Sequence, residues 1–174
     1  GEYVPEQVIA DRFGLSRTPV REAIRRLSDY GLVNIKPRSY VTVRNLAPEE
    51  AEDVALLRAS LESLAVRQLT KRGKNEDYNY LERLDKECHS LLKKGKLGEA
   101  FVKDSEFHIE IAKRTGNDHL YELSFKIDAK VQLLRLVLHL PKEKVNFFMN
   151  QHSLIIEAMR NEKINEADRL ISNH

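Results

Sequence analysis

The sequence predicts a mainly α-helical protein, in which an N-terminal winged helix-turn-helix (residues 1–46) is followed by an all-helical bundle (residues 47–174). Three observations support this prediction. Two short helical segments meet at a glycine and precede two runs rich in Val, Ile and Tyr. From Pro48 onward, apolar residues recur at helical spacing and no alternating strand pattern is present. Basic residues are concentrated at the start, where residues 1–45 hold eight Lys and Arg against five acidic side chains.

The first module is predicted to contain two helices and a hairpin. Residues 6–14 form the first helix. Ser16 suits the N-cap of the second helix, because its hydroxyl can accept a backbone N–H, and Pro19 is tolerated in the first turn. Gly31 ends this helix, and residues 32–46 form a small β-hairpin. The inward stripe of the second helix is Val20, Ala23, Ile24 and Leu27. This order of elements is typical of a winged helix-turn-helix.

The bundle is predicted to contain six helices, which end mostly at a glycine or a proline. They cover residues 48–72, 75–94, 97–115, 118–140, 142–161 and 164–174. The last of them reaches His174 without a capping residue, so we expect the chain to continue beyond it.

The composition argues against several classes of protein. Cys88 is the one cysteine among the 174 residues, so no internal disulfide can form. A reducing, cytoplasmic location is therefore expected. No apolar run approaches the roughly 20 residues that a membrane-spanning helix needs, and we expect no membrane partner.

The second helix of the first module carries arginines that are spaced for binding DNA. In a helix-turn-helix this helix enters the major groove with its N-terminal residues at the base edges. Arg17 and Arg21 share one face, and an arginine fork can pair with O6 and N7 of guanine. Residues of the hairpin can contact the backbone or the minor groove. The predicted DNA contacts are Ser16, Arg17, Thr18, Arg21, Arg25, Lys36 and Arg38. The alternative interpretation is a solvated basic helix face.

The stretch LSRTPVREAIRRLSDYGLV, residues 15–33, resembles the DNA-binding signature of GntR-type bacterial transcription regulators. The resemblance implies a homodimer that binds a palindromic double-stranded DNA operator, with Arg17, Thr18 and Arg21 contacting the bases. Two features depart from the family pattern. The module's usual first helix would precede Gly1, and the wing reads KPRSYV where the family usually has a glycine.

Polar residues occupy apolar positions on three of the predicted helices. One stripe follows a 4-3-4-3 spacing and consists of Leu97, Phe101, Asp104, His108 and Ile111. His152 and His174 lie on the stripes of two later helices. Burying a carboxylate without a partner is costly, and one carboxylate with three imidazoles suits a divalent metal ion. We predict that Asp104, His108, His152 and His174 bind Zn²⁺, with Ni²⁺, Mn²⁺ or Fe²⁺ as alternatives. Hydrogen-bonded core histidines are the competing interpretation.

The bundle resembles the FadR C-terminal domain type, FCD, of GntR regulators. The stretches LRASLESLAVRQLT (57–70) and DSEFHIEIAKRTGNDHLYEL (104–123) carry the resemblance. Many FCD members bind a divalent metal through an Asp, a His four residues later and two later histidines. The matching residues are Asp104, His108, His152 and His174.

Two arginines lie within apolar stretches of the bundle. Arg58 and Arg135 can each offer a fork to a carboxylate. In FCD proteins the effectors are often small organic acids, which implies that these arginines contact a small carboxylic acid. The alternative is that they lie on the surface with apolar stems covered, or pair with Glu62 or Asp128.

These predictions lead to three hypotheses about function. The preferred one is a metabolite-responsive transcriptional regulator, whose metal site helps to bind an organic acid effector. The second is a metal-sensing regulator, in which the ion itself is the signal. The third is a metal-dependent hydrolase, but no general base or nucleophile motif is present, so we expect the protein not to be an enzyme.

Overall fold

The computed structural model describes residues 1–36, 40–138 and 141–174, and residue contacts divide it into two units, Gly1–Ala51 and Glu52–His174. Each unit has its own apolar core. In the described part of the chain, no helix is long and apolar enough to cross a membrane.

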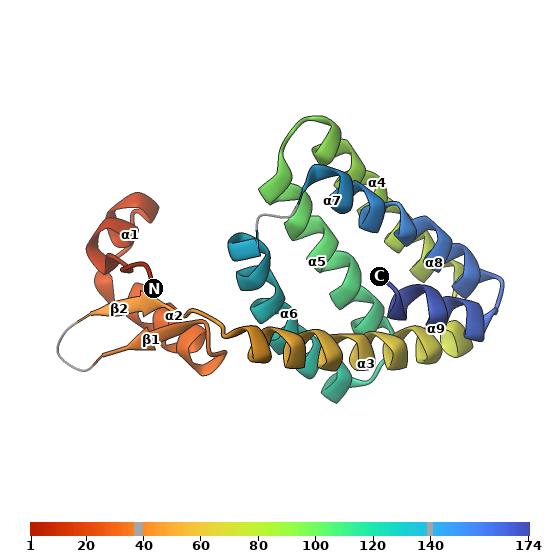
Figure 1. Ribbon diagram of the computed structural model, residues 1–174, viewed down its shortest axis with the longest axis horizontal. Helices are drawn as coiled ribbons and strands as arrows, with labels where there is room; N and C mark the ends of the chain where they lie inside the picture. The colour runs from red at the N-terminus through yellow and green to blue at the C-terminus, as the bar shows by residue number, and fades with distance from the viewer. Residues whose placement is uncertain (37–39, 139–140) are drawn as a thin grey trace. The chain divides into compact units, whose positions relative to one another are not determined.

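The first unit is a winged helix-turn-helix, as the sequence predicts (Figure 1). Its elements are α1 (Glu6–Phe13), α2 (Arg17–Asp29), β1 (Val33–Ile35) and β2 (Val41–Val43). The strands are antiparallel, with Val33 opposite Val43 and Ile35 opposite Val41. The buried core consists of Ala10, Val20, Ile24, Val33 and Val41. Residues 2–4 pair with β2 and extend the hairpin, which the sequence did not predict. The N–H of Val4 donates to the carbonyl of Val41 at 2.8 Å.

Two details of α2 differ from the sequence prediction. Ser16 is the N-cap residue, but its side chain makes no capping hydrogen bond. Leu27 was expected to face inward, yet it is 40% exposed, because the small core covers mainly the first turns of the helix around Val20 and Ile24. Gly31 follows the helix with a φ of 70°, a conformation that glycine adopts readily and that turns the chain into β1.

The second unit is a helical bundle. Its helices are α3 (Pro48–Arg72, beginning in the first unit), α4 (Asn75–Lys93), α5 (Leu97–Arg114), α6 (Asp118–Leu138), α7 (Lys142–Met149), α8 (Gln151–Arg160) and α9 (Ile164–Ser172). Helix α4 packs against α5 and α8, α5 packs against α6, and α8 packs against α9. Figure 1 shows that the C-terminal end of the chain lies among α5, α8 and α9.

The single helix predicted over residues 142–161 is wrong, because the chain forms α7 and α8 with a break at Asn150. Asparagine is a poor residue inside a helix, since its side chain competes for backbone hydrogen bonds. The break lets the two segments bury different faces. Val145 on α7 packs in a cluster around Cys88, whereas Ile155 on α8 packs in the main core.

Candidate metal centre and nucleic-acid interface

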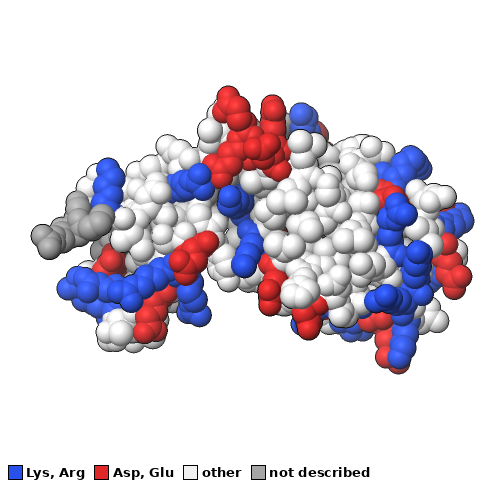
Figure 2. Space-filling model, turned by 90° about the horizontal axis from the view of Figure 1, so that it is seen from below, with Lys and Arg blue, Asp and Glu red and all other residues white. Residues whose placement is uncertain are grey.

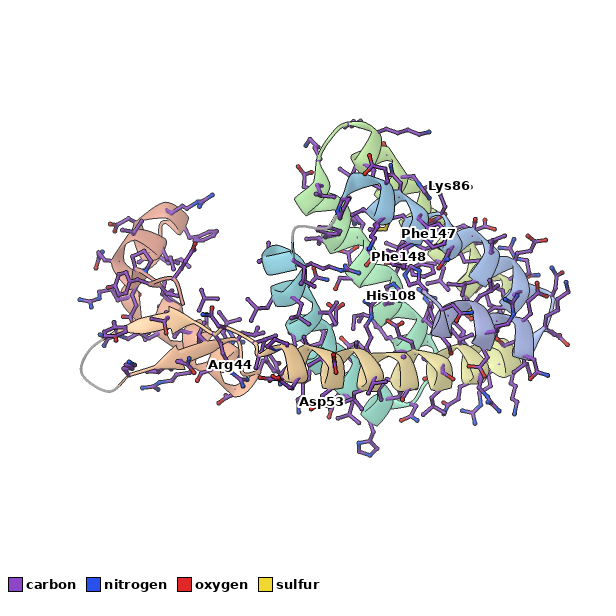
Figure 3. All side chains as sticks on the ribbon, viewed as in Figure 1. Arg44, Asp53, Lys86, His108, Phe147 and Phe148 are labelled. Atoms are coloured by element: carbon purple, nitrogen blue, oxygen red, sulfur yellow. The ribbon has the colours of Figure 1, made fainter. Side chains whose placement is uncertain are left out.

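The four predicted metal ligands come together inside the second unit. Asp104 and His108 on α5 are 1% and 5% exposed, and His152 on α8 is fully buried. His174 follows α9 and is half-buried. His108 and Phe148, labelled in Figure 3, both lie beside His174, with ring centroids 4.9 and 5.8 Å from that of His174. The stripe argument therefore placed these residues correctly, although Leu97, at the start of the α5 stripe, is 40% exposed.

One ligand atom from each residue points to a common centre. Nε2 of His152 lies 3.2 Å from Oδ1 of Asp104, and Nε2 of His174 lies 3.3 Å away from Nε2 of His152. Nε2 of His108 is 3.1 Å from Nε2 of His174 and 3.7 Å from Oδ1 of Asp104. All four ligand atoms lie within 4.8 Å of one another. Ligands bound about 2.1 Å from one ion at right angles are ~3.0 Å apart, which is close to these separations.

The opposite ring nitrogen of each histidine faces an oxygen atom. Nδ1 of His108 lies 2.9 Å from Oε1 of Glu62, and Nδ1 of His152 lies 3.3 Å from Oδ1 of Asp85. Nδ1 of His174 lies 3.3 Å from the amide oxygen of Gln151. An acceptor beside Nδ1 favours a proton on that nitrogen, and this leaves Nε2 with its lone pair directed at the centre.

Burial and neighbouring charges shift the pKa values of three of these ligands. Burial would raise the pKa of Asp104, but the charges of His108 and Arg135 hold that pKa well below its usual range. Burial, together with His108 and His152, lowers the pKa of His174 to about 2, so this imidazole is neutral near pH 7. Burial also lowers the pKa of His152, but Asp104 and Asp85 outweigh it and raise the pKa. A proton and a metal ion therefore compete for this imidazole.

The donor set fits a divalent cation. Three imidazole nitrogens and a carboxylate oxygen converge in a mostly buried space. Converging lone pairs repel one another unless a proton or a cation lies between them. Asp104, His108, His152 and His174 thus form a cluster that can hold a metal ion.

Replacing Asp85 by asparagine is expected to weaken metal binding about tenfold to a hundredfold without removing a ligand, because outer carboxylates orient metal-bound imidazoles and raise their basicity. Competition with a chelator of known affinity measures the change. Asp77→Asn is the control on the same helix, since Asp77 pairs with Arg114. Equal affinities in Asp85→Asn and the unmodified protein would contradict the role assigned to Asp85.

The two predicted effector arginines lie beside this cluster. Nε of Arg58 donates to Oε1 of Glu62 at 2.6 Å, and Nη2 of Arg135 forms an ion pair with Oδ2 of Asp104. The guanidinium of Arg135 also lies over the ring of Phe101. The second partner considered from the sequence, Asp128, accepts hydrogen bonds from Ser105 and Gln132 instead.

Both arginines line one cavity of about 190 Å³ together with Asp104 and His174. Nη2 of Arg58 and Nη1 of Arg135 are buried and have no hydrogen-bond partner among the residues that the structure describes. Each arginine is therefore anchored at one edge and has an unsatisfied donor at another.

The side chains of α2 that are predicted to contact DNA are exposed at the surface of the first unit. Arg17, Thr18, Arg21 and Arg25 all lie at the surface of α2. Nε of Arg21 donates to Oε2 of Glu6 at 2.9 Å, while 59% of the Arg21 side chain remains exposed. Figure 2 shows Lys and Arg side chains, with some acidic ones among them, on the visible face of this unit.

Two residues of the hairpin border a hollow beside α2. Nζ of Lys36 donates to the hydroxyl of Tyr40 at 3.0 Å, and both residues line a hollow of about 510 Å³ that α2 borders with Arg17 and Arg21. Arg38, also predicted to contact DNA, lies outside the described residues.

The sequence argument did not identify four residues that support these sites. Glu62, Asp85 and Gln151 face the outer nitrogens of the histidines, and Glu6 holds Arg21. Helical spacing could have revealed two of them. Asp85 falls on the 4-3-4 stripe of Leu81, Cys88 and Leu92, and Glu62 falls on that of Arg58, Ala65 and Leu69.

Comparisons with known proteins cover both units. Residues 53–174 match the family described as the FCD domain, and residues 1–43 match bacterial regulatory proteins, gntR family. The chain is 23% identical over 175 residues to the uncharacterized HTH-type transcriptional regulator YdhC of Bacillus subtilis (strain 168), covering 100% of this chain and 78% of that protein. It is 21% identical over 174 residues to the HTH-type transcriptional repressor RspR of Escherichia coli (strain K12), covering 100% and 76%.

Solved structures share the fold. Escherichia coli McbR/YncC aligns with a TM-score of 0.88 at 19% identity, over 99% of this chain and 82% of that one. A transcriptional regulator GntR from Rhodococcus sp. RHA1 aligns with a TM-score of 0.80 at 21% identity, over 99% of this chain and 83% of that one. These similarities confirm the predicted combination of a winged helix-turn-helix with a helical FCD domain.

Proposed function

Because the chain belongs to the gntR family of bacterial regulatory proteins and contains an FCD domain, we propose that it is a metabolite-responsive regulator that binds a palindromic operator as a dimer. It is a transcriptional regulator and not an enzyme, in keeping with its relatives. Residues 1–46 bind DNA, and residues 47–174 bind a divalent metal and a small carboxylic acid.

The metal part of this proposal rests on the convergence of four ligand atoms. Nδ1 of each of the three histidines also lies beside an oxygen of Glu62, Asp85 or Gln151. Three imidazoles and one carboxylate suit Zn²⁺ first, and Ni²⁺, Mn²⁺ or Fe²⁺ next. When bound, the ion supplies a positive charge that attracts an anion. It also leaves coordination positions free if its geometry is octahedral.

The effector part rests on Arg58 and Arg135. Both line one cavity that also reaches Asp104 and His174, and each has a buried N–H group without a partner among the described residues. A carboxylate accepts two parallel hydrogen bonds from guanidinium groups readily. An acid bound here would touch the metal cluster directly, which couples the two ligands.

The dimer is supported by apolar side chains at the surface of the bundle. Leu56 and Leu64 on α3 are 69% and 44% exposed, and Leu123 and Leu136 on α6 are 51% and 71% exposed. Exposed apolar surface is a common feature of protein interfaces. A two-fold dimer presents two copies of α2 to two half-sites, which makes the operator palindromic.

An effector changes operator affinity only if it binds two arrangements of the dimer unequally. The test uses the full chain and an operator selected from random double-stranded DNA. Operator affinity is measured by fluorescence anisotropy across a buffered range of free metal, with and without a panel of carboxylic acids.

We expect an acid to change operator affinity at saturating metal, while metal alone has little effect within the physiological range. If metal alone switches DNA binding across that range, the metal-sensing alternative replaces this proposal. If neither ligand changes the affinity, the regulatory part is wrong.

A further inference from the structure

The polar end of the cavity matches a single carboxylate. Glu62 and Asp104 hold Arg58 and Arg135 at one edge, so the directions of the remaining N–H groups are fixed. Nη2 of Arg58 and Nη1 of Arg135 are the unpartnered donors. Two donors satisfy the two oxygens of one carboxylate, and the described lining offers no further cationic side chain for a second acid group.

The rest of the cavity wall is apolar. It includes Phe101, Val131, Leu134, Val145, Phe148 and Met149. Apart from Arg58, Arg135, Asp104 and His174, no described lining residue carries a side-chain nitrogen or oxygen. A hydroxyl or a second carboxylate that lies against this apolar part of the wall, away from Asp104, His174 and the bound ion, would therefore be buried without a partner, which costs binding free energy.

The volume limits the body of the ligand. The cavity measures about 190 Å³. An apolar protein cavity of ~150 Å³ holds one benzene molecule. A body of about six to eight non-hydrogen atoms therefore fits this space, whereas a long acyl chain would have to extend into solvent.

We infer that this cavity selects a compact monocarboxylate with an apolar body and discriminates against hydroxylated and dicarboxylic acids. The inference rests on the proposed effector function and specifies the chemistry of the effector. The carboxylate lies between Arg58 and Arg135 beside the metal cluster, and the apolar body lies against Phe101, Val131 and Phe148.

Four probes with the same six-carbon chain test this inference. Hexanoate has one carboxylate, gluconate adds hydroxyls, adipate adds a second carboxylate, and hexanamide lacks the charge. Isothermal titration of the full chain saturated with Zn²⁺ measures each affinity. We expect hexanoate to bind at least tenfold more tightly than the other three.

The outcomes separate this inference from the proposed function. If gluconate or adipate binds most tightly, the selectivity is wrong while acid binding stands. If hexanamide equals hexanoate, the pairing of a carboxylate with the arginines is wrong. If none of these acids nor any acid in a wider panel binds, the effector part of the proposed function fails as well.

A variant in the wall provides a second measurement. Val131→Thr keeps the shape of the side chain and adds a hydroxyl to the apolar wall. We expect this variant to bind hexanoate several-fold more weakly. We also expect the ratio of the hexanoate affinity to the gluconate affinity to become smaller. Val102→Thr is the control, because Val102 is 55% exposed on α5 and does not line the cavity. Equal hexanoate affinities in a folded Val131→Thr and the control would overturn the placement of the apolar body.

Discussion

Replacing His152 by alanine is expected to abolish stable metal binding. His152 is fully buried, and its Nε2 contacts both Asp104 and His174 at 3.2 and 3.3 Å. We expect the unmodified protein to hold about one divalent ion per chain, measured by elemental mass spectrometry after reconstitution. Loss of a direct ligand should exceed the roughly tenfold to hundredfold loss that outer residues cause.

The melting temperature gives an independent measurement of the same effect. An ion at one hundred times its dissociation constant stabilises the folded state by ~2.7 kcal/mol, which corresponds to about 5–10 °C for a chain of this size. His152→Ala should lose this metal-dependent increase. His119→Ala is the matched control, because His119 is exposed at the start of α6. Absence of metal from the reconstituted unmodified protein would contradict the site.

Replacing Arg21 by alanine is expected to weaken binding to the selected operator by about 1–3 kcal/mol, the usual contribution of a bidentate arginine–guanine pair. Glu6 binds Nε of Arg21, and 59% of the Arg21 side chain is exposed. We expect the Nη1 and Nη2 groups, which do not pair with Glu6, to bind guanine. Fluorescence anisotropy with labelled operator measures the difference.

The Arg21→Lys variant distinguishes base contact from charge. Lysine keeps the positive charge but lacks the planar fork. If Arg21 contacts a base, Lys should recover little of the lost operator affinity, and binding to random DNA should change less. If alanine weakens operator and random DNA equally while lysine restores both, Arg21 contacts only phosphates.

Helical spacing alone was enough to predict that the four candidate ligands face the interior of the bundle. Each of Asp104, His108, His152 and His174 interrupts an apolar stripe, and a stripe faces the core wherever helices pack. Local residue patterns also predicted that α2 and the hairpin belong to a first module that precedes the bundle. These features depend on local periodicity, so they can be predicted from the sequence.

Other features depend on contacts between distant segments. The apolar stripe does not show that α7 and α8 break at Asn150, because the stripe through Val145, His152 and Ile155 continues across the break, and one asparagine is too weak a signal by itself. The pairing of Arg135 with Asp104 joins α6 to α5 and requires knowledge of their packing. The contact of residues 2–4 with β2 is likewise long-range.

The sequence separation of the ligands has a consequence for folding. His108 and His174 are 66 residues apart, yet their Nε2 atoms lie 3.1 Å from each other. An ion bound to both would close a loop of that length, as a disulfide does. A covalent link over such a loop reduces the entropy of the unfolded chain by an amount equivalent to ~4 kcal/mol. Cys88 is the one cysteine among these 174 residues, so no disulfide can form within them, and a bound ion would be a reversible cross-link between α5 and the residues that follow α9.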